Sequence, residues 1–342
     1  MSKVTIVDVT LRDGNHTYGH QFTPEIVAKT AAALDRAGVD YIEVGHGDGL
    51  GGSCIHVGRS ATSDMELIKA AVGAVKNAKI SIILIPGMGS FQDLEMSAEL
   101  GVSMARIGTH CTEADITEQH LQRAADLGLL PVGYLVSVGM ASAERLASEA
   151  AKMESYGAQY INLAESQGHL VPSEVAERIR AVRKAVKIPI GFHPHNNLGL
   201  AIGNILAALG EGATFIDGSL KGFGGGAGNA QTEVAVAALK KAGYDINPTL
   251  FETLDAADVF QSMVQPHPMP SLDNDSILMG FANVYGGYVL PVKKAASEYG
   301  CDPRELILRL GARRVVHAQE DAVIDEAQKL VSESRSVPEV TV

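Results

Sequence analysis

The 342-residue sequence has no tryptophan and only three cysteines, at positions 54, 111 and 301. The cysteines lie far apart and are odd in number, so they offer neither a disulfide framework nor a CxxC pair. Such sparse cysteine usage is typical of a reducing compartment, and we expect a cytoplasmic protein. Cys111 follows His110, but an inert buried thiol is a more common state than a nucleophile.

Long apolar runs are also absent. No stretch reaches the length of about 18 to 20 apolar residues that spans a bilayer. The opening stretch "MSKVTIVDVTLRDG" enters a strand pattern at once and lacks the regions of a signal peptide. We therefore expect neither a membrane span nor a secretion signal.

Positive charge is scarce, because 28 Lys and Arg residues face 40 Asp and Glu residues, a formal net charge of −12. The resulting field repels nucleic acid and anionic membrane surfaces, which argues against either as a partner. An anionic substrate then needs a local positive group, which an arginine or a metal ion provides.

The sequence does contain eight short β-rich runs that alternate with stretches of helical periodicity. Strict alternation predicts an α/β protein with a parallel sheet, and eight units predict a closed (β/α)8 TIM barrel. A doubly wound open sheet is the alternative, but the first turn reads "LRDGNH" and not GxGxxG. The runs span residues 4–10, 40–45, 79–85, 104–108, 131–138, 159–164, 188–192 and 214–219.

The pattern changes after about residue 250, where helical periodicity replaces the alternation. We expect residues 1–250 to form the catalytic barrel and residues 251–342 to form a helical appendage packed on it. A chain of this length accommodates one large domain with a smaller one.

The stretch "HPHNNLGLA" follows the seventh run and places His193 and His195 two residues apart, on the same side of a strand. In a (β/α)8 barrel, the carboxyl ends of the strands carry the chemistry, and the first strand delivers Asp13 there. One carboxylate and two imidazoles form a set that binds a catalytic divalent metal with positions left open. Mn²⁺, Mg²⁺, Co²⁺ and Fe²⁺ all suit this set, and oxygen-rich coordination favours Mn²⁺. A packed pair of core histidines is the alternative.

Three further strand-end features accompany this set. Arg12 suits a substrate carboxylate or an enolate oxygen, with an ion pair as the alternative. His16 suits general-base work, in competition with His20, His46 and His110. The glycine-rich loop at 222–230 lacks the end of a P-loop, so its glycines favour close backbone approach to the barrel mouth.

These motifs carry a family resemblance. "TLRDG", "HPHNNLGLA" and "GGGAGNA" resemble the metal-dependent superfamily that includes isopropylmalate synthase, homocitrate synthase and hydroxymethylglutaryl-CoA lyase. With "IEVGHGDGLGGSC", "RIGTHCTEAD" and "AQEDAVIDEA" added, nearly the whole chain resembles the 4-hydroxy-2-oxovalerate aldolase family, the pyruvate-specific class II aldolases of aromatic hydrocarbon and steroid catabolism.

The resemblance implies a Mn²⁺-dependent lyase, an oligomer, that cleaves 4-hydroxy-2-oxoacids such as 4-hydroxy-2-oxopentanoate to pyruvate and a short aldehyde. It also implies an acylating aldehyde dehydrogenase as partner subunit, in contact with the C-terminal region. It implies that Asp13, His193 and His195 bind the metal, that His16 is the catalytic base and that Arg12 stabilises the enolate. It further implies that the substrate is contacted by Arg12, Asp13, Ser166, His193 and Tyr285.

The chain departs from the family at "ESQG" (165–168), where DSAG is usual, and at "NVYGGY" (283–288), where GVYSSF is usual. Both departures leave the metal set intact and bear on the aldehyde and on dehydrogenase docking. Tyr285 reaches a substrate only if the appendage covers the barrel mouth; packing within the appendage is the alternative. The run "IILIPG" (82–87) is expected to line the aldehyde side of the pocket.

Two other functions compete. A Claisen-type acyl-CoA-dependent synthase or lyase of the same superfamily is the first, although His16 stands where those enzymes carry another residue and no second large acyl-CoA domain is evident. A catalytically silent scaffold for a dehydrogenase is the second, but a scaffold needs no open metal set.

Overall fold

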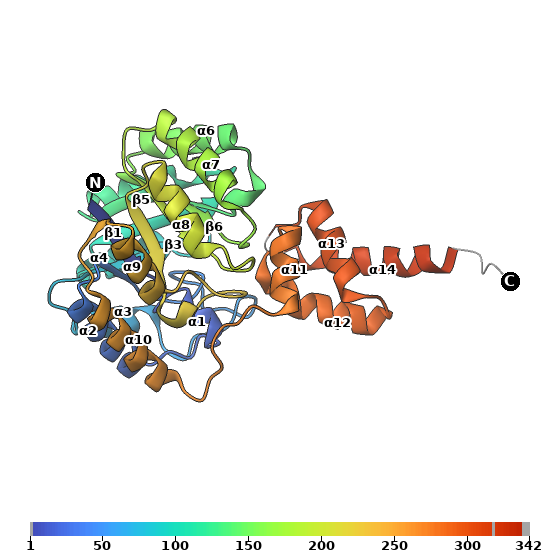
Figure 1. Ribbon diagram of the computed structural model, residues 1–342, viewed down its shortest axis with the longest axis horizontal. Helices are drawn as coiled ribbons and strands as arrows, with labels where there is room; N and C mark the ends of the chain where they lie inside the picture. Colours follow the sequence, from blue (N-terminus) through green and yellow to red (C-terminus); the bar gives the residue numbers. More distant parts are fainter. Residues whose placement is uncertain (1–2, 317–318, 337–342) are drawn as a thin grey trace.

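The computed structural model describes residues 3–316 and 319–336, and in it eight parallel strands close into a barrel (Figure 1). The strands follow one another around the barrel in chain order, and pairing of β1 with β2 closes it. The expected (β/α)8 architecture is confirmed. The strands are β1 (Lys3–Asp8), β2 (Tyr41–Glu43), β3 (Lys79–Leu84), β4 (Met104–His110), β5 (Leu130–Val136), β6 (Tyr160–Glu165), β7 (Ile190–Pro194) and β8 (Phe215–Gly218).

Strand boundaries differ from the sequence pattern where proline or length intervenes. β7 begins at Ile190, after Pro189, because proline has no N–H to donate to a neighbouring strand. A ninth strand, β9 (Asp245–Ile246), pairs with the first two residues of β1 at the amino end of the barrel. Two residues are too few to show a periodicity, so the sequence pattern contains no sign of β9.

Helices on the outside of the barrel begin and end at side-chain and glycine caps. Thr23 caps α2, which starts with proline and ends at Gly38 in the left-handed region. Ser63 and Ser90 form capping boxes at α3 and α4. The helices are α1 (Gly14–Thr17), α2 (Pro24–Ala37), α3 (Asp64–Val72), α4 (Phe91–Glu99), α5 (Glu118–Asp126), α6 (Ala143–Ser155), α7 (Pro172–Ala185), α8 (Ala201–Gly210), α9 (Thr232–Lys241) and α10 (Leu250–Val264).

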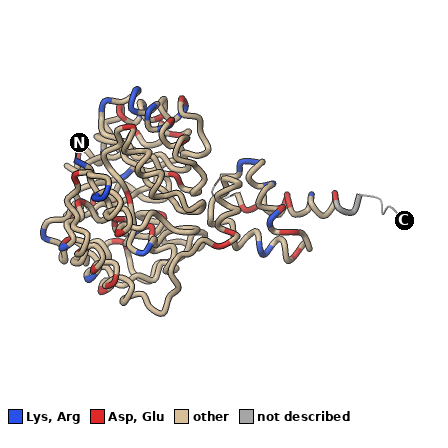
Figure 2. Tube along the Cα trace, viewed as in Figure 1, with Lys and Arg blue, Asp and Glu red and all other residues tan. Residues whose placement is uncertain are grey.

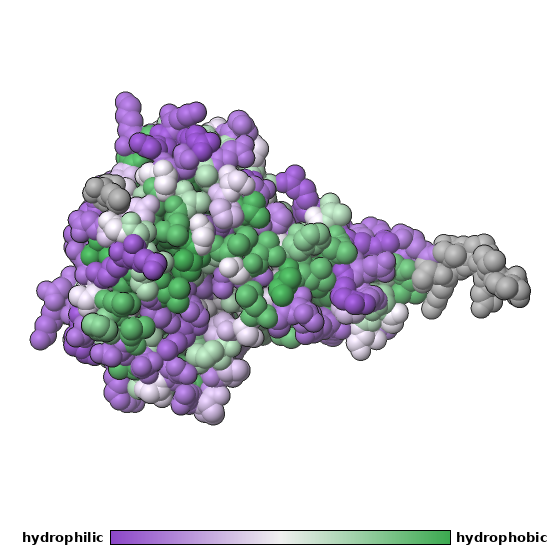
Figure 3. Space-filling model, viewed as in Figure 1, coloured by the Kyte–Doolittle hydropathy of each residue, from purple (hydrophilic) through white to green (hydrophobic). Residues whose placement is uncertain are grey.

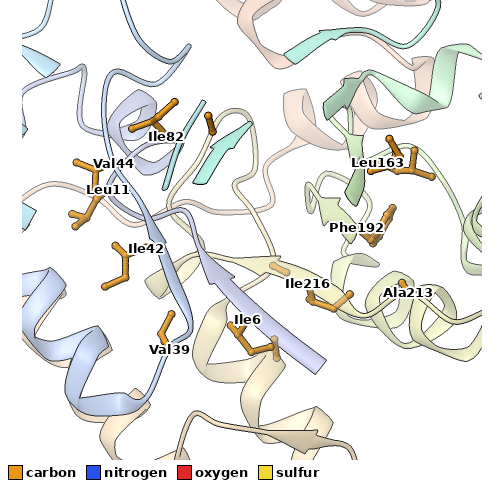
Figure 4. Close-up of a cluster of buried hydrophobic side chains, with 14 of the residues drawn as sticks. Ile6, Leu11, Val39, Ile42, Val44, Ile82, Leu163, Phe192, Ala213 and Ile216 are labelled. Carbon is orange, nitrogen blue, oxygen red and sulfur yellow. The ribbon is translucent and has the colours of Figure 1, made fainter. Parts of the chain in front are cut away.

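The main core lies between the strands and these helices. Figure 4 shows side chains of this layer, among them Ile6, Ile42 and Phe192 of the strands, which are at most 2% exposed. The intervening positions point into the barrel, where Val7, Val132 and Tyr160 belong to a small apolar layer. The strand alternation thus gives the barrel two faces with different chemistry.

The last helices divide between two cores. α10 packs against α2, and its buried side chains belong to the core of the barrel. A separate apolar core holds α11 (Asn274–Ala282), α12 (Val289–Tyr299), α13 (Pro303–Arg313) and α14 (Glu320–Ser336). α11 lies next to the barrel and α14 extends away from it (Figure 1). Acidic and basic residues are interspersed on the outer helices of both parts (Figure 2).

Of the expected region 251–342, residues 317–318 and 337–342 lie outside the described residues. Within the described ranges, no helix combines the length and apolar character required to cross a bilayer.

The glycine-rich loop after β8 (222–230) folds back so that Gly228 packs against the backbone of Gly222. Gly228 has a φ of 85°, and a Cβ added there would lie 1.9 Å from the carbonyl oxygen of Gly222. No side chain fits at that distance, so the loop needs glycine for both its backbone angle and its close approach. This tight loop brings Gly225 to the barrel mouth, where its carbonyl oxygen lies 3.2 Å from His195.

We expect Gly228→Ala to destabilise the protein more than Gly243→Ala. Gly243 has a φ of 81° but no atom within 4 Å of an added Cβ, so it carries only the backbone penalty of roughly 1–2 kcal/mol. Gly228→Ala adds a clash with backbone. Urea unfolding of the two variants measures the difference, and equal free energies of unfolding would contradict the close approach.

Candidate active site

One cavity of about 90 Å³ at the carboxyl ends of the strands is lined by every residue that the sequence analysis assigned as metal ligand, base or substrate contact. Its walls are completed by residues of β3, β5 and β6 and of the loops after β2 and β3, among them Ile83, Ile85 and Tyr134. The structure therefore brings together seven residues from both ends of the chain: Arg12, Asp13, His16, Ser166, His193, His195 and Tyr285.

The centre of this cavity is a group of one carboxylate and two imidazoles. His193 is in β7 and His195 follows it directly, while Asp13 follows β1, with β8 between the two strands. The Nε2 atoms of His193 and His195 lie 3.3 Å and 3.6 Å from Oδ2 of Asp13. All three side chains are buried.

The outer nitrogens of both histidines are held by groups that accept hydrogen bonds. Nδ1 of His193 lies 3.0 Å from Oδ2 of Asp217, and Nδ1 of His195 lies 3.2 Å from the carbonyl oxygen of Gly225. Both nitrogens therefore donate, and in the neutral rings each Nε2 presents a lone pair to Asp13. Two lone pairs and a carboxylate oxygen converge, which is the donor arrangement that suits a divalent cation.

The charges of Asp13 and His195 suit the same role. At His193, burial lowers the pKa, but the interactions with Asp13 and Asp217 outweigh burial and raise it. Burial lowers the pKa of His195 to about 4, although the charge of Asp13 opposes that shift, so this imidazole is neutral at pH 7. Burial raises the pKa of Asp13, but the Arg12 guanidinium and the two histidines outweigh it and hold the pKa well below its usual range. A carboxylate and a neutral imidazole are the protonation states in which these residues ligate metals.

Arg12 is fixed beside this centre. Its Nε donates to Oε1 of Glu43 at 2.6 Å, and its Nη1 donates to the carbonyl oxygen of Gly47 at 3.1 Å. Nη1 also lies 3.1 Å from Asp13. The planar guanidinium is thus oriented at the cavity wall, where it can stabilise negative charge on a ligand.

A buried charge network supports these residues from inside the barrel. Arg106 donates two hydrogen bonds of 2.7 Å to Asp217 and lies 3.2 Å from Glu43. Since Asp217 also holds His193 and Glu43 also holds Arg12, Arg106 links both sides of the cavity. Sequence reasoning missed these three residues. The signal was present, because each is a charged residue inside a run that reads as a buried strand.

His16 is in the short helix α1 and lines the cavity, with its Nε2 4.0 Å from Oδ1 of Asp48. The competing histidines do not line it. His20 and His46 stack on each other beside His16, and His110 bonds to Thr112. Of the four histidines considered for proton transfer, His16 alone is placed at the cavity.

The two departures from the family motifs serve local structure. In "ESQG" the departing Gln167 donates to the Ser137 hydroxyl, next to Ser166, which the family motif shares and which accepts a hydrogen bond from the Ser137 N–H. Tyr288 is in the second core, where its hydroxyl donates to the carbonyl oxygen of Val316. Cys111 is buried, which raises the pKa of its thiol to about 12 and makes it inert as expected.

Comparison with known sequences gives two family matches. The HMGL-like family matches residues 3–260, and the DmpG-like communication domain matches residues 270–332. Relatives named 4-hydroxy-2-oxovalerate aldolase are 46% identical in Pelotomaculum thermopropionicum, covering 98% of both chains, and 48% identical in Geobacillus thermodenitrificans, covering 96% of both. A relative of the same name in Thermomicrobium roseum is 47% identical and covers 97% of this chain and 93% of its own.

Solved structures share the fold. The carboxyl transferase domain of Rhizobium etli pyruvate carboxylase superposes with a TM-score of 0.77 at 18% identity, covering 97% of this chain and 60% of that chain. An N-terminal domain from Bacteroides vulgatus superposes with a TM-score of 0.71 at 24% identity, covering 84% of this chain and 95% of that chain. At these identities the likeness concerns architecture alone.

We expect Asp217→Asn to weaken Mn²⁺ binding by about 10- to 100-fold, the usual effect of removing a partner of a ligating histidine. An amide has only one acceptor oxygen and so loses a bond to His193 or to Arg106. The matched control is Asp8→Asn, another buried carboxyl at a strand end, which bonds Thr10 and Thr232 and not a histidine. Titration followed by the EPR signal of free Mn²⁺ measures both affinities; equal affinities would contradict the role of Asp217.

Proposed function

The chain belongs to the HMGL-like family and, within it, to the 4-hydroxy-2-oxovalerate aldolases, and from this we propose that it cleaves a 4-hydroxy-2-oxoacid such as 4-hydroxy-2-oxopentanoate to pyruvate and a short aldehyde. The reaction is reversible as an aldol addition. The observation that carries the proposal is the convergence of Asp13, His193 and His195 with Arg12 and His16 in one small cavity.

We propose Asp13, His193 and His195 as the ligands of a divalent metal, with Mn²⁺ as the ion and Mg²⁺ or Co²⁺ as substitutes. When bound, the metal supplies a Lewis acid for the oxygens of the 2-oxoacid. The convergence of one carboxylate and two imidazole lone pairs supports this assignment.

The protein groups account for the movement of protons and charge. His16 accepts the proton of the 4-hydroxyl group, the aldehyde carbonyl forms, and the C3–C4 bond breaks toward the 2-oxoacid. Arg12, oriented by Glu43, stabilises the negative charge on the enolate oxygen of pyruvate. Protonation at C3 then completes pyruvate. Removal of one such preorganised donor typically costs about 2.7–4 kcal/mol of transition-state stabilisation.

The walls of the cavity determine which substrates fit. Ile83, Ile85 and Val136 form an apolar side that suits a short alkyl chain on the aldehyde, while Ser166 and Tyr285 add polar contacts for the 2-oxoacid. A cavity of about 90 Å³ leaves little room for a larger acyl donor. The Claisen-type acyl-CoA alternative is therefore less favoured than the aldolase.

We propose that the helices α11 to α14 form a partner-contact part that also covers the active site, and that this part begins after α10 and not at residue 251. The match to a communication domain over residues 270–332 supports this role. Tyr285, which precedes α12, reaches the active-site cavity, and a second cavity of about 250 Å³ adjoins it between Asp48, Tyr288 and Glu320.

Apolar side chains on this part suit an acylating aldehyde dehydrogenase as the partner subunit. Phe281 is 67% exposed and Leu290 is 77% exposed, on α11 and α12. Figure 3 shows apolar surface where these helices adjoin the barrel. We further propose an oligomer in the cytoplasm, in keeping with the unpaired cysteines of the described residues.

The function is tested with protein stripped of metal and reloaded with Mn²⁺. We expect pyruvate from 4-hydroxy-2-oxopentanoate, measured by coupling to NADH oxidation, and none above background without metal. His16→Asn should lower kcat by about 10²- to 10⁴-fold, the usual contribution of general-base catalysis, with metal content unchanged. His110→Asn is the matched control and should keep wild-type activity. Absence of metal-dependent pyruvate formation in the wild-type protein would overturn the proposal.

Tyr285→Phe tests whether the C-terminal part takes part in catalysis. We expect kcat/KM to fall by about tenfold with metal content unchanged, because one hydrogen bond to the substrate is lost. The control is Tyr288→Phe. The native Tyr288 hydroxyl bonds Val316 and Gln319 within the helical part, so its loss should lower thermal stability and leave turnover unchanged. Wild-type turnover in Tyr285→Phe would return this tyrosine to a packing role.

A further inference from the structure

A second group of metal-type donors lies beside the proposed catalytic site. His16, His20 and Asp48 each offer one ligand atom, and these atoms all lie within 4.8 Å of one another. The two histidines are in and just after α1, and Asp48 is in the loop after β2. The donor set, two imidazoles and one carboxylate, has the same composition as Asp13 with His193 and His195.

His46 supports this group without being available to it. Its Nε2 lies 3.0 Å from the carbonyl oxygen of Gly58, and its Nδ1 accepts the N–H of Asp48 at 3.1 Å. Both ring nitrogens are therefore used. The His46 ring also stacks on His20 with 3.9 Å between centroids. His46 thus fixes the backbone of Asp48 and the plane of His20, which leaves the donor atoms of the group in place.

The group lacks hydrogen bonds that its burial would normally require. Among the described residues, Nδ1 of His20 and Oδ2 of Asp48 are buried and have no hydrogen-bond partner. The Asp48 oxygens lie 4.0 Å from Nε2 of His16 and 3.7 Å from Nδ1 of His46, beyond hydrogen-bond distance. The Asp48 side chain is 12% exposed, but its buried Oδ2 has no donor, which is costly and calls for an explanation.

No lysine or arginine of the described residues forms a salt bridge with Asp48. The basic groups nearest to its carboxylate are the rings of His16 and His46, at 4.0 Å and 3.7 Å. A bound cation would supply the missing positive charge and use the free lone pair.

An ion has access to the group from outside. His16 and Asp48 line the active-site cavity and also the adjoining cavity of about 250 Å³. The outer cavity is also lined by His56 and Glu320, which favour a cation. Its volume leaves room for water molecules to complete the coordination of a metal.

We propose that His16, His20 and Asp48 form a second divalent-metal site, preferred by ions with high affinity for imidazole such as Zn²⁺, and that its occupation stops catalysis. The inhibitory part rests on the proposed function, because a ligated His16 has no lone pair with which to accept the substrate proton. Zn²⁺ binds nitrogen donors more tightly than Mn²⁺ does. Mn²⁺-loaded enzyme should therefore lose activity when Zn²⁺ fills the second site.

Equilibrium dialysis of the metal-free protein against Zn²⁺ alone tests the site without substrate. We expect two bound ions for each wild-type chain and one for His20→Asn. Asparagine is chosen because His20 has a φ of 60°, a left-handed conformation that asparagine tolerates. Asp48→Asn, as a second variant, should also bind one ion. His120→Asn is the matched control, since His120 stacks on Phe91 away from both sites, and it should bind two.

Activity of the Mn²⁺-loaded enzyme with added Zn²⁺ tests inhibition. We expect His20→Asn to keep basal turnover and to need at least about tenfold more Zn²⁺ for half-inhibition, while His120→Asn follows the wild type. One Zn²⁺ for each wild-type chain, or equal inhibition of His20→Asn and wild type, would overturn the proposal in favour of simple Mn²⁺ displacement. Two bound ions without any pyruvate formation would retain the site and refute the aldolase; pyruvate formation with one bound ion would do the reverse.

Discussion

The side chain of Arg106 is the element on which the site depends, because it is fully buried and pairs with two buried carboxylates at once. Removing a charge from water costs several kcal/mol, and only close pairing offsets that cost. Asp217 and Glu43 supply the pairing, and each has a second partner at the cavity wall. Arg12 is thereby tied to β2 and β4, and His193 is tied to β4 and β8. The positions of Arg12 and His193 at the cavity therefore depend on the pairing of Arg106 with both carboxylates.

The network also explains what the sequence could and could not predict. Eight strands were recognisable because buried strands and amphipathic helices have different periods, and the histidine pair because residues two apart share a strand face. The pairing of Arg106 with Asp217 joins residues 111 positions apart, and it depends on barrel closure and register. No local pattern contains that information, although a charged residue within a buried strand signals that a partner exists.

The choice among the histidines shows a second limit of sequence reasoning. Residue type alone left His16, His20, His46 and His110 as candidates for proton transfer. The structure distinguishes them: His20 adopts a φ of 60° after α1 and stacks on His46, and among the four only His16 lines the cavity. Gly58 allows this, since an added Cβ there would lie 2.6 Å from the His20 ring. Loop conformation and glycine contacts of this kind become visible only in three dimensions.

The two donor sets at the barrel mouth have the same composition but differ in what surrounds them. Both histidines beside Asp13 are fixed through Nδ1, by Asp217 and by the Gly225 carbonyl oxygen, so their lone pairs are directed before any ion arrives. Arg12 further offsets the charge of Asp13. Asp48 has no such cation among the described salt bridges, and Nδ1 of His20 has no hydrogen-bond partner there. A set whose lone pairs are directed by hydrogen bonds can hold an ion that binds imidazole weakly, such as Mn²⁺, whereas a set with an unpartnered ring nitrogen and carboxylate oxygen favours an ion with strong nitrogen affinity. We therefore expect two sets of the same composition to differ in metal preference, because the hydrogen bonds behind them differ.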